Sequence, residues 1–209
     1  MSAQKFTTLL ADPPWQEQGG GGRGAQNHYP LLNARSIARV MIASPVWQPA
    51  AHAHLWLWAT NSFLLQAMSV IDALGFRYVT NVAWVKAELG DTPARGLGYY
   101  FRGSHELLLF AVRGSGGTVR SKRRDLPSVI FGKRTQHSTK PESAYQLIEA
   151  RSVGPRCELF ARTRRPGWAS WGNAESLGTE PMEMEHERTE DREGREDPKQ
   201  ARPRHEEVR

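Results

Sequence analysis

FTTLLADPPW, residues 6–15, sets the framework for the rest of the chain. Its first part, Phe6–Ala11, contains only apolar residues and threonine, which predicts a short strand buried on both faces. Proline has no backbone N–H for a sheet ladder, so the two prolines that follow Asp12 must lie beyond the strand. The sequence therefore predicts an interior strand that ends in a carboxylate and a rigid turn.

Apolar runs and helical patterns alternate after this strand. Six further runs are predicted as strands: Ala53–Ala59, Arg77–Lys86, His105–Val112, Ser128–Phe131, Cys157–Ala161 and Gly167–Trp171. Three segments are predicted as helices: Ser36–Ile42, Ser62–Leu74 with Asn61 as its N-cap and Gly75 as its end, and a segment from Pro141 to about Arg151. The alternation indicates an α/β fold, with a mostly parallel, twisted sheet flanked by helices. Ligands of such sheets bind beyond the carboxyl ends of the strands, which is where Asp12 lies.

The chain is expected to divide into one folded domain and a tail. Residues 1–174 are long enough to bury a substantial core as one domain. Residues 175–209 are highly charged and poor in apolar residues, which predicts disorder. Glu88–Gly103 is a long loop of the kind that is often functional.

The net charge of +6 is unevenly distributed. Residues 175–209 hold 12 acidic and 7 basic residues, a net of −5, which leaves 10 acidic and 21 basic residues, a net of +11, in residues 1–174. A basic domain attracts the phosphate backbone of nucleic acid through counterion release. The same charge also serves plain solubility, and charge alone does not separate the two interpretations.

Composition disfavours several classes of protein. A single cysteine, Cys157, excludes an internal disulfide and a cysteine-rich zinc site, and is expected to be a small buried side chain. His52 and His54 share a strand face but lack a third spaced ligand, so we expect no metal. Met1–Lys5 leads straight into a strand without a signal peptide, and no apolar run approaches the roughly 20 residues that span a bilayer. We therefore expect a cytoplasmic protein with no membrane contact.

Gly19–Gly24 (GGGGRG) formally matches the dinucleotide-binding pattern G-x-G-x-x-G, but no strand leads into it and no clear helix follows. A mobile lid over a base pocket and a plain flexible loop are equally good interpretations. The phosphate-binding pattern G-x-x-x-x-G-K-[ST] does not occur in the chain, which disfavours an NTPase.

Asp12–Trp15 (DPPW) combines groups suited to the exocyclic amine of a nucleobase. The lone pair of such an amine is delocalised into the ring, so the nitrogen is a poor nucleophile. The Asp12 carboxylate and a backbone carbonyl held by consecutive prolines could each accept one amine hydrogen, and the flat Trp15 ring could stack on the base. The alternative is a strand that ends in a structural turn with a core tryptophan.

Further short elements follow Asp12–Trp15 along the chain. They lie at Asn27–Pro30, Trp58–Asn61, Trp84–Lys86, Arg102–Glu106, His137–Pro141, Glu158–Arg162 and Trp168–Asn173. Each is weak alone, but in type and order the whole set resembles the MT-A70 family of adenine-N6 methyltransferases, which is similar to the β-class DNA amino-methyltransferases. The resemblance spans about residues 6–174. It implies a Rossmann-like S-adenosylmethionine-dependent methyltransferase fold, with S-adenosyl-L-methionine as cofactor and no metal.

The resemblance implies roles for individual residues. The catalytic residues would be Asp12, Pro13, Pro14 and Trp15. The cofactor-binding residues would be Asp12, Ser138, Lys140, Glu158, Phe160, Arg162 and Asn173. Glu158 would accept hydrogen bonds from two ribose hydroxyls, and Lys140 would meet the methionine carboxylate or a nearby acidic group. Two alternatives stay open: Phe160 as plain core, and Lys140 as a solvated lysine at a helix start.

The residues expected to contact the nucleic acid come from several segments: Tyr29, Lys86, Arg102, His105, Glu106, Arg120, Lys122, Arg123 and Arg124. The last four belong to a basic loop, for which we favour phosphate contacts over mere solvation. An adenine inside a duplex cannot reach a pocket of this kind. The substrate is therefore expected to be single-stranded, or the base to be flipped out of the helix.

We favour DNA as the substrate because the domain is compact and carries no recognisable RNA-binding appendage, like the small stand-alone family members of bacteria and phages. An RNA adenine-N6 methyltransferase with the same chemistry is the first rival. A non-catalytic nucleic-acid-binding partner is the second, and the intact Asp12–Trp15 segment argues against it. Methylation of cytosine N4 is the third, disfavoured by Asp rather than Ser at position 12. Assembly as a homo- or heterodimer is left open.

Overall fold

The computed structural model describes residues 4–15, 32–87, 100–133 and 139–172. Within these residues seven strands form one sheet: β1 (Phe6–Ala11), β2 (Pro49–Ala59), β3 (Arg77–Ala87), β4 (His105–Arg113), β5 (Val129–Lys133), β6 (Arg156–Ala161) and β7 (Trp168–Gly172). The same residues contain the helices α1 (Ala34–Ala43), α2 (Leu64–Ala73) and α3 (Glu142–Arg151) and the 3₁₀ turns η2 (Asn61–Phe63) and η3 (Gly116–Val119). Every predicted strand is present, and the α/β fold class is confirmed.

The order of strands across the sheet is β5-β3-β4-β2-β1-β6-β7. Neighbouring strands are parallel except where β4 pairs with β2 and β3. The prediction of a mostly parallel sheet is therefore confirmed, with β4 reversed. The reversal brings the start of β4 to the side where the other strands finish, and it carries the end of β4 to the opposite side. We call these sides the Asp12 end and the Arg113 end of the sheet.

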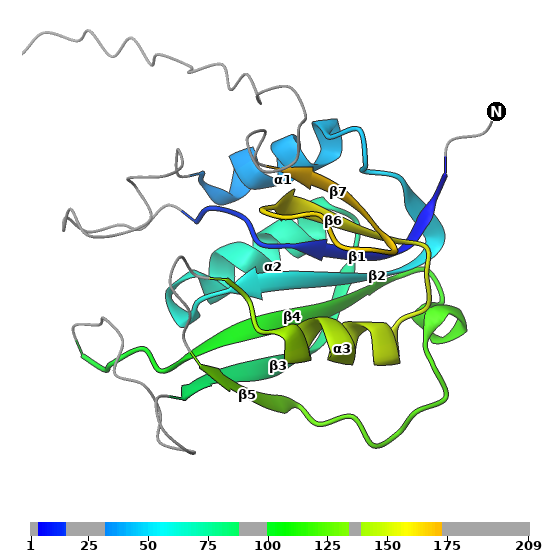
Figure 1. The fold of residues 1–209 in the computed structure, drawn as a ribbon. Helices are drawn as coiled ribbons and strands as arrows, with labels where there is room; N and C mark the ends of the chain where they lie inside the picture. Colours follow the sequence, from blue (N-terminus) through cyan, green and yellow to red (C-terminus); the bar gives the residue numbers. More distant parts are fainter. Residues whose placement is uncertain (1–3, 16–31, 88–99, 134–138, 173–209) are drawn as a thin grey trace, which may run out of the picture.

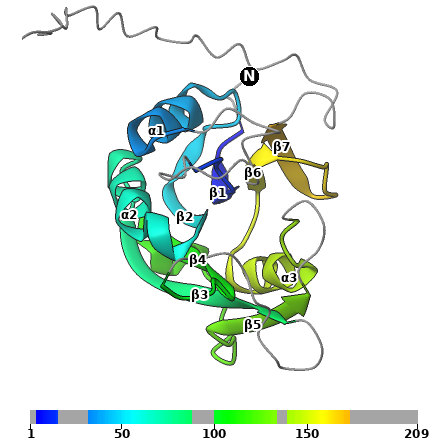
Figure 2. The same ribbon diagram turned by 90° about the vertical axis from the view of Figure 1, so that its left-hand side faces the viewer.

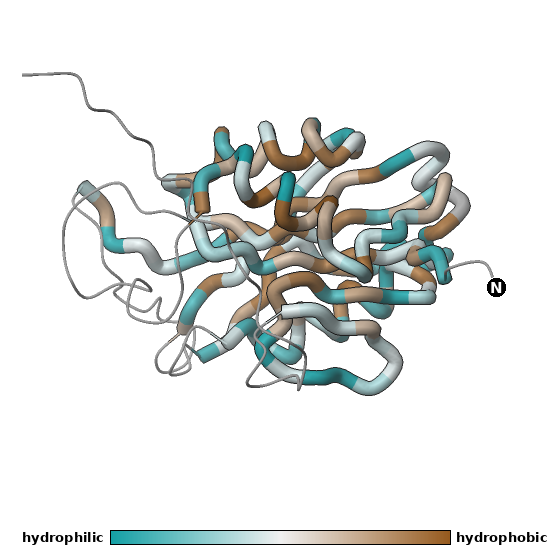
Figure 3. The backbone as a smooth tube through the Cα atoms, turned by 90° about the horizontal axis from the view of Figure 1, so that it is seen from above, coloured by the Kyte–Doolittle hydropathy of each residue, from teal (hydrophilic) through white to brown (hydrophobic). Residues whose placement is uncertain are grey.

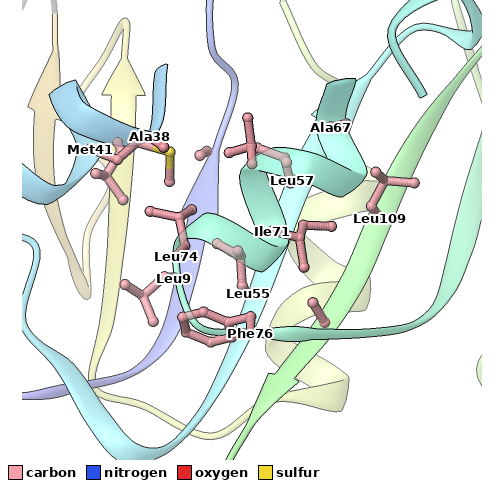
Figure 4. Packing of buried hydrophobic residues seen from close by; sticks show 14 of the residues in the cluster. Leu9, Ala38, Met41, Leu55, Leu57, Ala67, Ile71, Leu74, Phe76 and Leu109 are labelled. Atoms are coloured by element: carbon pink, nitrogen blue, oxygen red, sulfur yellow. The ribbon is translucent and has the colours of Figure 1, made fainter. Parts of the chain in front are cut away.

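Helices cover both faces of the sheet, with α1 and α2 on one face and α3 on the other (Figure 1, Figure 2). Leu9 and Leu55 pack toward α1 and α2 (Figure 4), whereas their neighbours Leu10 and Trp56 belong to the cluster that packs with α3. Successive side chains of a strand point to opposite faces, so strands covered on both faces appear as continuous apolar runs. Figure 3 shows apolar segments concentrated in the middle of the molecule and hydrophilic ones mainly at its periphery.

The ends of the helices follow local signals in part. Gly75 ends the second helix as predicted, with φ of 73° in the left-handed region that favours glycine. The prediction that Asn61 caps this helix is wrong. The chain first makes the turn η2, whose N-cap residue is Thr60, and the Asn61 amide instead donates to His105 Nε2 at 3.0 Å. The hydrogen bond of Asn61 with His105, 44 residues away in sequence, is formed in place of the local bond that would cap the helix.

Other expectations concern burial and absent features. Cys157 is fully buried, as expected of a structural thiol. The residues that the structure describes contain no group of three or more His, Cys, Asp or Glu suited to a metal ion. In the same residues no helix is both long and apolar enough to cross a membrane. Gly19–Gly24, residues 88–99 of the long loop and residues 175–209 lie outside the described residues.

Candidate functional site

Four charged side chains meet at the Asp12 end of the sheet. Lys140 Nζ lies 2.9 Å from Asp12 Oδ1 and 3.1 Å from Glu106 Oε2. Lys86 Nζ lies 2.5 Å from Glu106 Oε1. Asp12 follows β1, Lys86 lies near the end of β3, Glu106 lies near the start of β4, and Lys140 precedes α3. We call these four residues the charged quartet, and the reversal of β4 is what lets Glu106 join it.

Burial and mutual attraction oppose each other within the charged quartet. The Lys140 side chain is only 9% exposed. Burial alone would lower the pKa of Lys140, but Asp12 and Glu106 outweigh it and raise that pKa above its ordinary value. Burial would raise the pKa of Glu106, but Lys140 and Lys86 outweigh it and lower that pKa. Lys140 and Glu106 therefore stay ionised near neutral pH, and an ammonium group is held against the Asp12 carboxylate.

Trp15 is anchored in a defined orientation. Its indole N–H donates to the carbonyl of Trp58 at 2.9 Å, and its ring stacks on Phe63 with centroids 5.7 Å apart and planes at 13°. The Pro14 carbonyl accepts a hydrogen bond from the Leu32 N–H at 2.9 Å. The turn after β1 is therefore held from several sides, as a preorganised acceptor requires.

Glu158 is a second buried carboxylate, in β6. It is 7% exposed and accepts a hydrogen bond from the Tyr145 hydroxyl of α3 at 2.8 Å. Burial raises the pKa of Glu158 to about 7, although the bond from Tyr145 acts in the opposite direction. Glu158 therefore changes its charge in the neutral range.

The end of β6 is irregular. Phe160 has φ of 60°, in the left-handed region, and the pairing of β6 with β7 shifts register between Leu159 and Ala161. The Phe160 ring lies edge-on to Trp171, with centroids 5.9 Å apart. Arg162 follows directly, and its Nη2 lies 4.0 Å from Asp12 Oδ2. Non-glycine residues in this region cluster at functional sites, because the surrounding structure must stabilise the strained backbone.

The family model for MT-A70 matches residues 6–174, a range that includes every site residue named so far in this subsection. The chain belongs to the MT-A70 family. It is similar to a putative N(6)-adenosine-methyltransferase MT-A70-like protein of Medicago truncatula, 27% identical over 176 residues, covering 81% of this chain and 26% of that protein. It is also similar to the human N(6)-adenosine-methyltransferase catalytic subunit METTL3, 29% identical over 175 residues, covering 81% of this chain and 28% of METTL3.

A shorter relative of this MT-A70 chain is the Type II methyltransferase M.MunI of a Mycoplasma species. The two are 26% identical over 189 residues, covering 81% of this chain and 77% of M.MunI. The chain thus spans about a quarter of the length of the plant and human relatives and about three quarters of M.MunI.

The structure brings most of the residues expected from the MT-A70 resemblance to the Asp12 end. These are Asp12, Pro13, Pro14, Trp15, Lys86, Arg102, His105, Glu106, Lys140, Glu158, Phe160 and Arg162. Lys140 was expected to meet either the methionine carboxylate of the cofactor or a nearby acidic group, and the structure shows it beside the acidic groups of Asp12 and Glu106. Tyr29, Ser138 and Asn173 lie outside the described residues.

Four expected substrate contacts lie elsewhere in this MT-A70 chain. Arg120, Lys122, Arg123 and Arg124 follow β4 and therefore lie at the Arg113 end. Seven steps of about 3.4 Å along β4 separate Glu106 from Arg113, a span of roughly 24 Å. The structure does not bring these four residues to the charged quartet.

Two contributors to the site were missed by the sequence analysis. The Lys140 ammonium lies over the Trp58 ring, 5.2 Å from its centroid, and Tyr145 holds Glu158. Trp58 lies in one of the MT-A70 elements, which indicates its position but not its contact with Lys140. The buried residues of α3 are Ala144, Leu147 and Ile148, which have helical spacing. This spacing places Tyr145 at the margin of the buried face, and it is the sequence pattern that could have indicated the position of Tyr145.

Gly172, at the end of β7, is expected to be indispensable for the irregular pairing beside Phe160. A Cβ at position 172 would meet the carbonyl oxygen of Ala161 and lie 2.5 Å from its nitrogen. We therefore expect Gly172→Ala to lower the free energy of unfolding by about 1–3 kcal/mol, the usual cost of overpacking. Urea unfolding followed by circular dichroism measures it. Gly117→Ala, where the added Cβ meets nothing within 4 Å, is the matched control and should change stability little. Equal effects of the two substitutions would contradict the steric explanation.

Proposed function

We propose that this MT-A70 chain transfers the methyl group of S-adenosylmethionine to N6 of adenine in nucleic acid. The observation that carries the proposal is the ion pair between Lys140 and Asp12, whose Nζ and Oδ1 atoms are 2.9 Å apart. Asp12 is the first residue of the intact Asp12–Trp15 segment. A buried ammonium keeps the Asp12 carboxylate in one place, at the carboxyl end of a central strand, where ligands of such sheets bind. The MT-A70 match and the names of the relatives support the same chemistry.

The proposed mechanism depends on preorganised acceptors. Asp12 accepts one hydrogen of the adenine N6 amine, and a backbone carbonyl of the Pro13–Pro14 turn accepts the other. Because Leu32 already donates to the Pro14 carbonyl, we assign the second acceptor to Pro13. Two accepted hydrogen bonds pull the nitrogen toward a tetrahedral shape and free its lone pair, while Trp15 holds the base in line. The N6 atom gains the methyl group, S-adenosylhomocysteine would be the other product, and the proton that N6 loses is released to solvent.

The residues at this end of the sheet fit S-adenosylmethionine, which supplies an activated methyl group when bound. Glu158 is a buried carboxylate suited to two ribose hydroxyls. Ser170 pairs with Glu158 across β6 and β7, and its buried hydroxyl has no hydrogen-bond partner within the described part of the chain. Buried polar groups are normally satisfied, so such an orphan beside a buried carboxylate suits a polar ligand. Arg162 and Lys140 would stabilise the negative charge of the cofactor's carboxylate.

Binding of S-adenosylmethionine is expected to tighten as the pH rises through 7. The pKa of Glu158 is raised to about 7, so its carboxylate is mostly protonated at pH 6 and mostly ionised at pH 8. Only the ionised form accepts two hydroxyl hydrogens, and the apparent affinity scales with the competent fraction, which gives a change of about tenfold between these pH values. Isothermal titration at pH 6 and 8 measures it. Glu158→Gln should bind S-adenosylmethionine weakly and with little pH dependence. If this variant kept the tenfold pH dependence of the wild type, Glu158 would not be its cause.

The raised pKa of Glu158 also gives a sign for stability. The folded state binds more protons than the unfolded chain between the ordinary carboxyl pKa and about 7. The contribution of Glu158 to the free energy of unfolding of the cofactor-free protein therefore falls as the pH rises through that window.

We further propose DNA as the preferred substrate. The similarity to M.MunI, a Type II methyltransferase, supports this proposal, because it extends over 77% of that protein, against 26% and 28% of the plant and human proteins. RNA is the second candidate, favoured by the N6-methyladenosine RNA methyltransferase MTA1 of Pyricularia oryzae, 26% identical over 188 residues, covering 82% of this chain and 47% of MTA1.

The test uses purified full-length protein and S-adenosylmethionine labelled in its methyl group. Matched single- and double-stranded DNA and RNA oligonucleotides are incubated separately, and methylated nucleosides are quantified after digestion. N6-methyladenine that disappears with Asp12→Ala is the expected result, and the best substrate decides between DNA and RNA. Cofactor binding without product on any substrate would indicate a missing partner chain. Neither binding nor product would overturn the proposal.

A further inference from the structure

A cavity of about 490 Å³ lies at the Arg113 end of the sheet and contains none of the charged quartet in its lining. Its floor comes from β2, β3 and β4, including Trp56 and Phe110, whose ring centroids are 4.6 Å apart. Its walls come from the segment 116–128 and from Leu147 and Arg151 of α3. Pockets for small molecules usually enclose about 300–1,000 Å³, so the cavity has room for a ligand.

Positive charge dominates the lining of this cavity. Five arginines from three separate segments contribute to it: Arg77, Arg120, Arg123, Arg124 and Arg151. No Asp or Glu is among the lining residues within the described part of the chain. Across the same described residues, the one ion pair that these arginines make is Arg123 with Asp125, at 2.5 Å. Such a group of guanidiniums is suited to phosphate, which they bind through bidentate hydrogen bonds.

The segment that carries Arg120, Arg123 and Arg124 is bound to the end of α3. The Ser121 N–H donates to the Arg151 carbonyl at 2.7 Å, and Arg151 Nη1 donates to the Arg123 carbonyl at 3.0 Å. Arg120 forms a β-bridge with Ser152. The loop is thus ordered by long-range contacts before any ligand binds, which lowers the entropic cost of binding.

The floor of the cavity is aromatic and neutral. His54 donates through Nε2 to the Gly116 carbonyl at 2.8 Å, and its ring lies edge-on to Phe110 with centroids 4.8 Å apart. Burial lowers the pKa of His54, so the ring stays uncharged near neutral pH. Aromatic rings form sequence-tolerant contacts with nucleobases, and a rim of arginines attracts the phosphates that flank them.

We propose that this cavity binds a nucleotide unit, with its phosphate on the arginines and its base over Phe110, the partly exposed ring of the floor. Two sources share this chemistry: a nucleic-acid strand, at a position remote from the methylated adenine, and a free nucleotide. The two tests below distinguish them. As a strand contact the site rests on the proposed function and extends it to the far end of the sheet. As a site for a free nucleotide it is independent of methyl transfer.

The first test measures binding of a fluorescein-labelled 12-residue oligothymidylate to the full-length protein by anisotropy, without cofactor. This probe contains no adenine, so it does not depend on the base pocket at Asp12. We expect Arg120→Glu/Arg124→Glu to weaken binding at least about tenfold and to reduce the salt slope by about 1.4, or about 0.7 for each phosphate that is no longer neutralised. Arg35→Glu/Arg39→Glu makes the same charge change on exposed positions of α1, on the other face of the sheet, and should weaken binding far less. Equal effects of both variants would overturn the site, because net charge alone would then explain binding.

The second test compares thymidine diphosphate with pyrophosphate by isothermal titration. A nucleotide cavity should bind thymidine diphosphate at least about tenfold more tightly than pyrophosphate, and lose this preference in Arg120→Glu/Arg124→Glu. Equal affinities would overturn the nucleotide assignment, because the arginines would then bind anions without a nucleoside. An oligothymidylate that binds much more tightly than thymidine diphosphate identifies a strand as the source, whereas similar affinities identify a free nucleotide. Neither test measures methyl transfer, so failure of the proposed function would leave both results interpretable.

Discussion

Asp12→Asn is expected to reduce the rate of adenine methylation by about 10²–10³-fold while the protein remains folded. Asparagine keeps the shape of the side chain but removes the negative charge that accepts the amine hydrogen, and loss of one preorganised group of this kind costs about that factor. Lys140 retains Glu106 at 3.1 Å, so its charge is not left unpaired. Single-turnover rates with labelled cofactor measure the loss, and differential scanning calorimetry should show a change in Tm of only a few degrees.

The control for Asp12→Asn is Asp72→Asn. Asp72 is an exposed carboxylate near the end of α2, on the face of the sheet opposite the cavity and away from the charged quartet. We expect its loss to leave the single-turnover rate unchanged within about twofold, because exposed surface substitutions usually have small effects. If Asp12→Asn retained more than about a tenth of the wild-type rate, Asp12 would not be the acceptor that the mechanism requires.

Lys140→Met is expected to damage both activity and stability. The substitution removes the buried ammonium group that Asp12 and Glu106 both contact. Removal of one partner from a buried ion pair lowers the free energy of unfolding by about 3–5 kcal/mol. Two carboxylates that share a buried site cannot both ionise easily, so the pKa of one must rise. A protonated Asp12 is a poor acceptor, and we expect a rate loss of at least about 10²-fold together with a clearly lower Tm.

Lys86→Met is the matched control for this substitution. Lys86 contacts Glu106 but not Asp12, and its side chain is 18% exposed against 9% for Lys140. Its loss should therefore cost less stability and leave the rate within about tenfold of wild type. Adding Asp12→Asn to Lys140→Met should recover stability without recovery of the rate, because Glu106 keeps Lys86 as its partner and the carboxylate that lost its ammonium is removed. Equal behaviour of Lys140→Met and Lys86→Met would contradict a specific role of Lys140 beside Asp12.

Much of the fold could be predicted from local patterns. β1 and the buried part of β2, Ala53–Ala59, are mostly apolar because both of their faces are covered, and Phe6–Ala11 ends where the prolines remove its hydrogen-bond donors. Gly75 ends α2 because its positive φ is easily reached without a Cβ. The error at Asn61 arose because capping is a local tendency, and a tertiary partner, His105, replaced it.

The candidate site was predictable residue by residue but not as an arrangement. Asp12, Lys140 and Glu158 each lie in a short element typical of the family. Their contacts depend on how distant strands pair. Asp12 and Lys140, for example, are 128 positions apart in sequence. The contact between Tyr145 and Glu158 likewise requires α3 to pack on β6, which no local pattern specifies.

Local patterns along the chain were sufficient for the strands, the helices, the Asp12–Trp15 segment at a strand end and the family. These features depend on residues that are near one another in sequence, where side-chain period and proline chemistry act directly. The direction of β4 is different, because it is decided by pairing with β2 and β3 across the sheet. That single reversal brings Glu106 to Lys140 and Asp12, and it carries Arg120 and Arg124 to the opposite end. Which charges form the candidate active site and which form the second cavity is therefore set by tertiary structure alone.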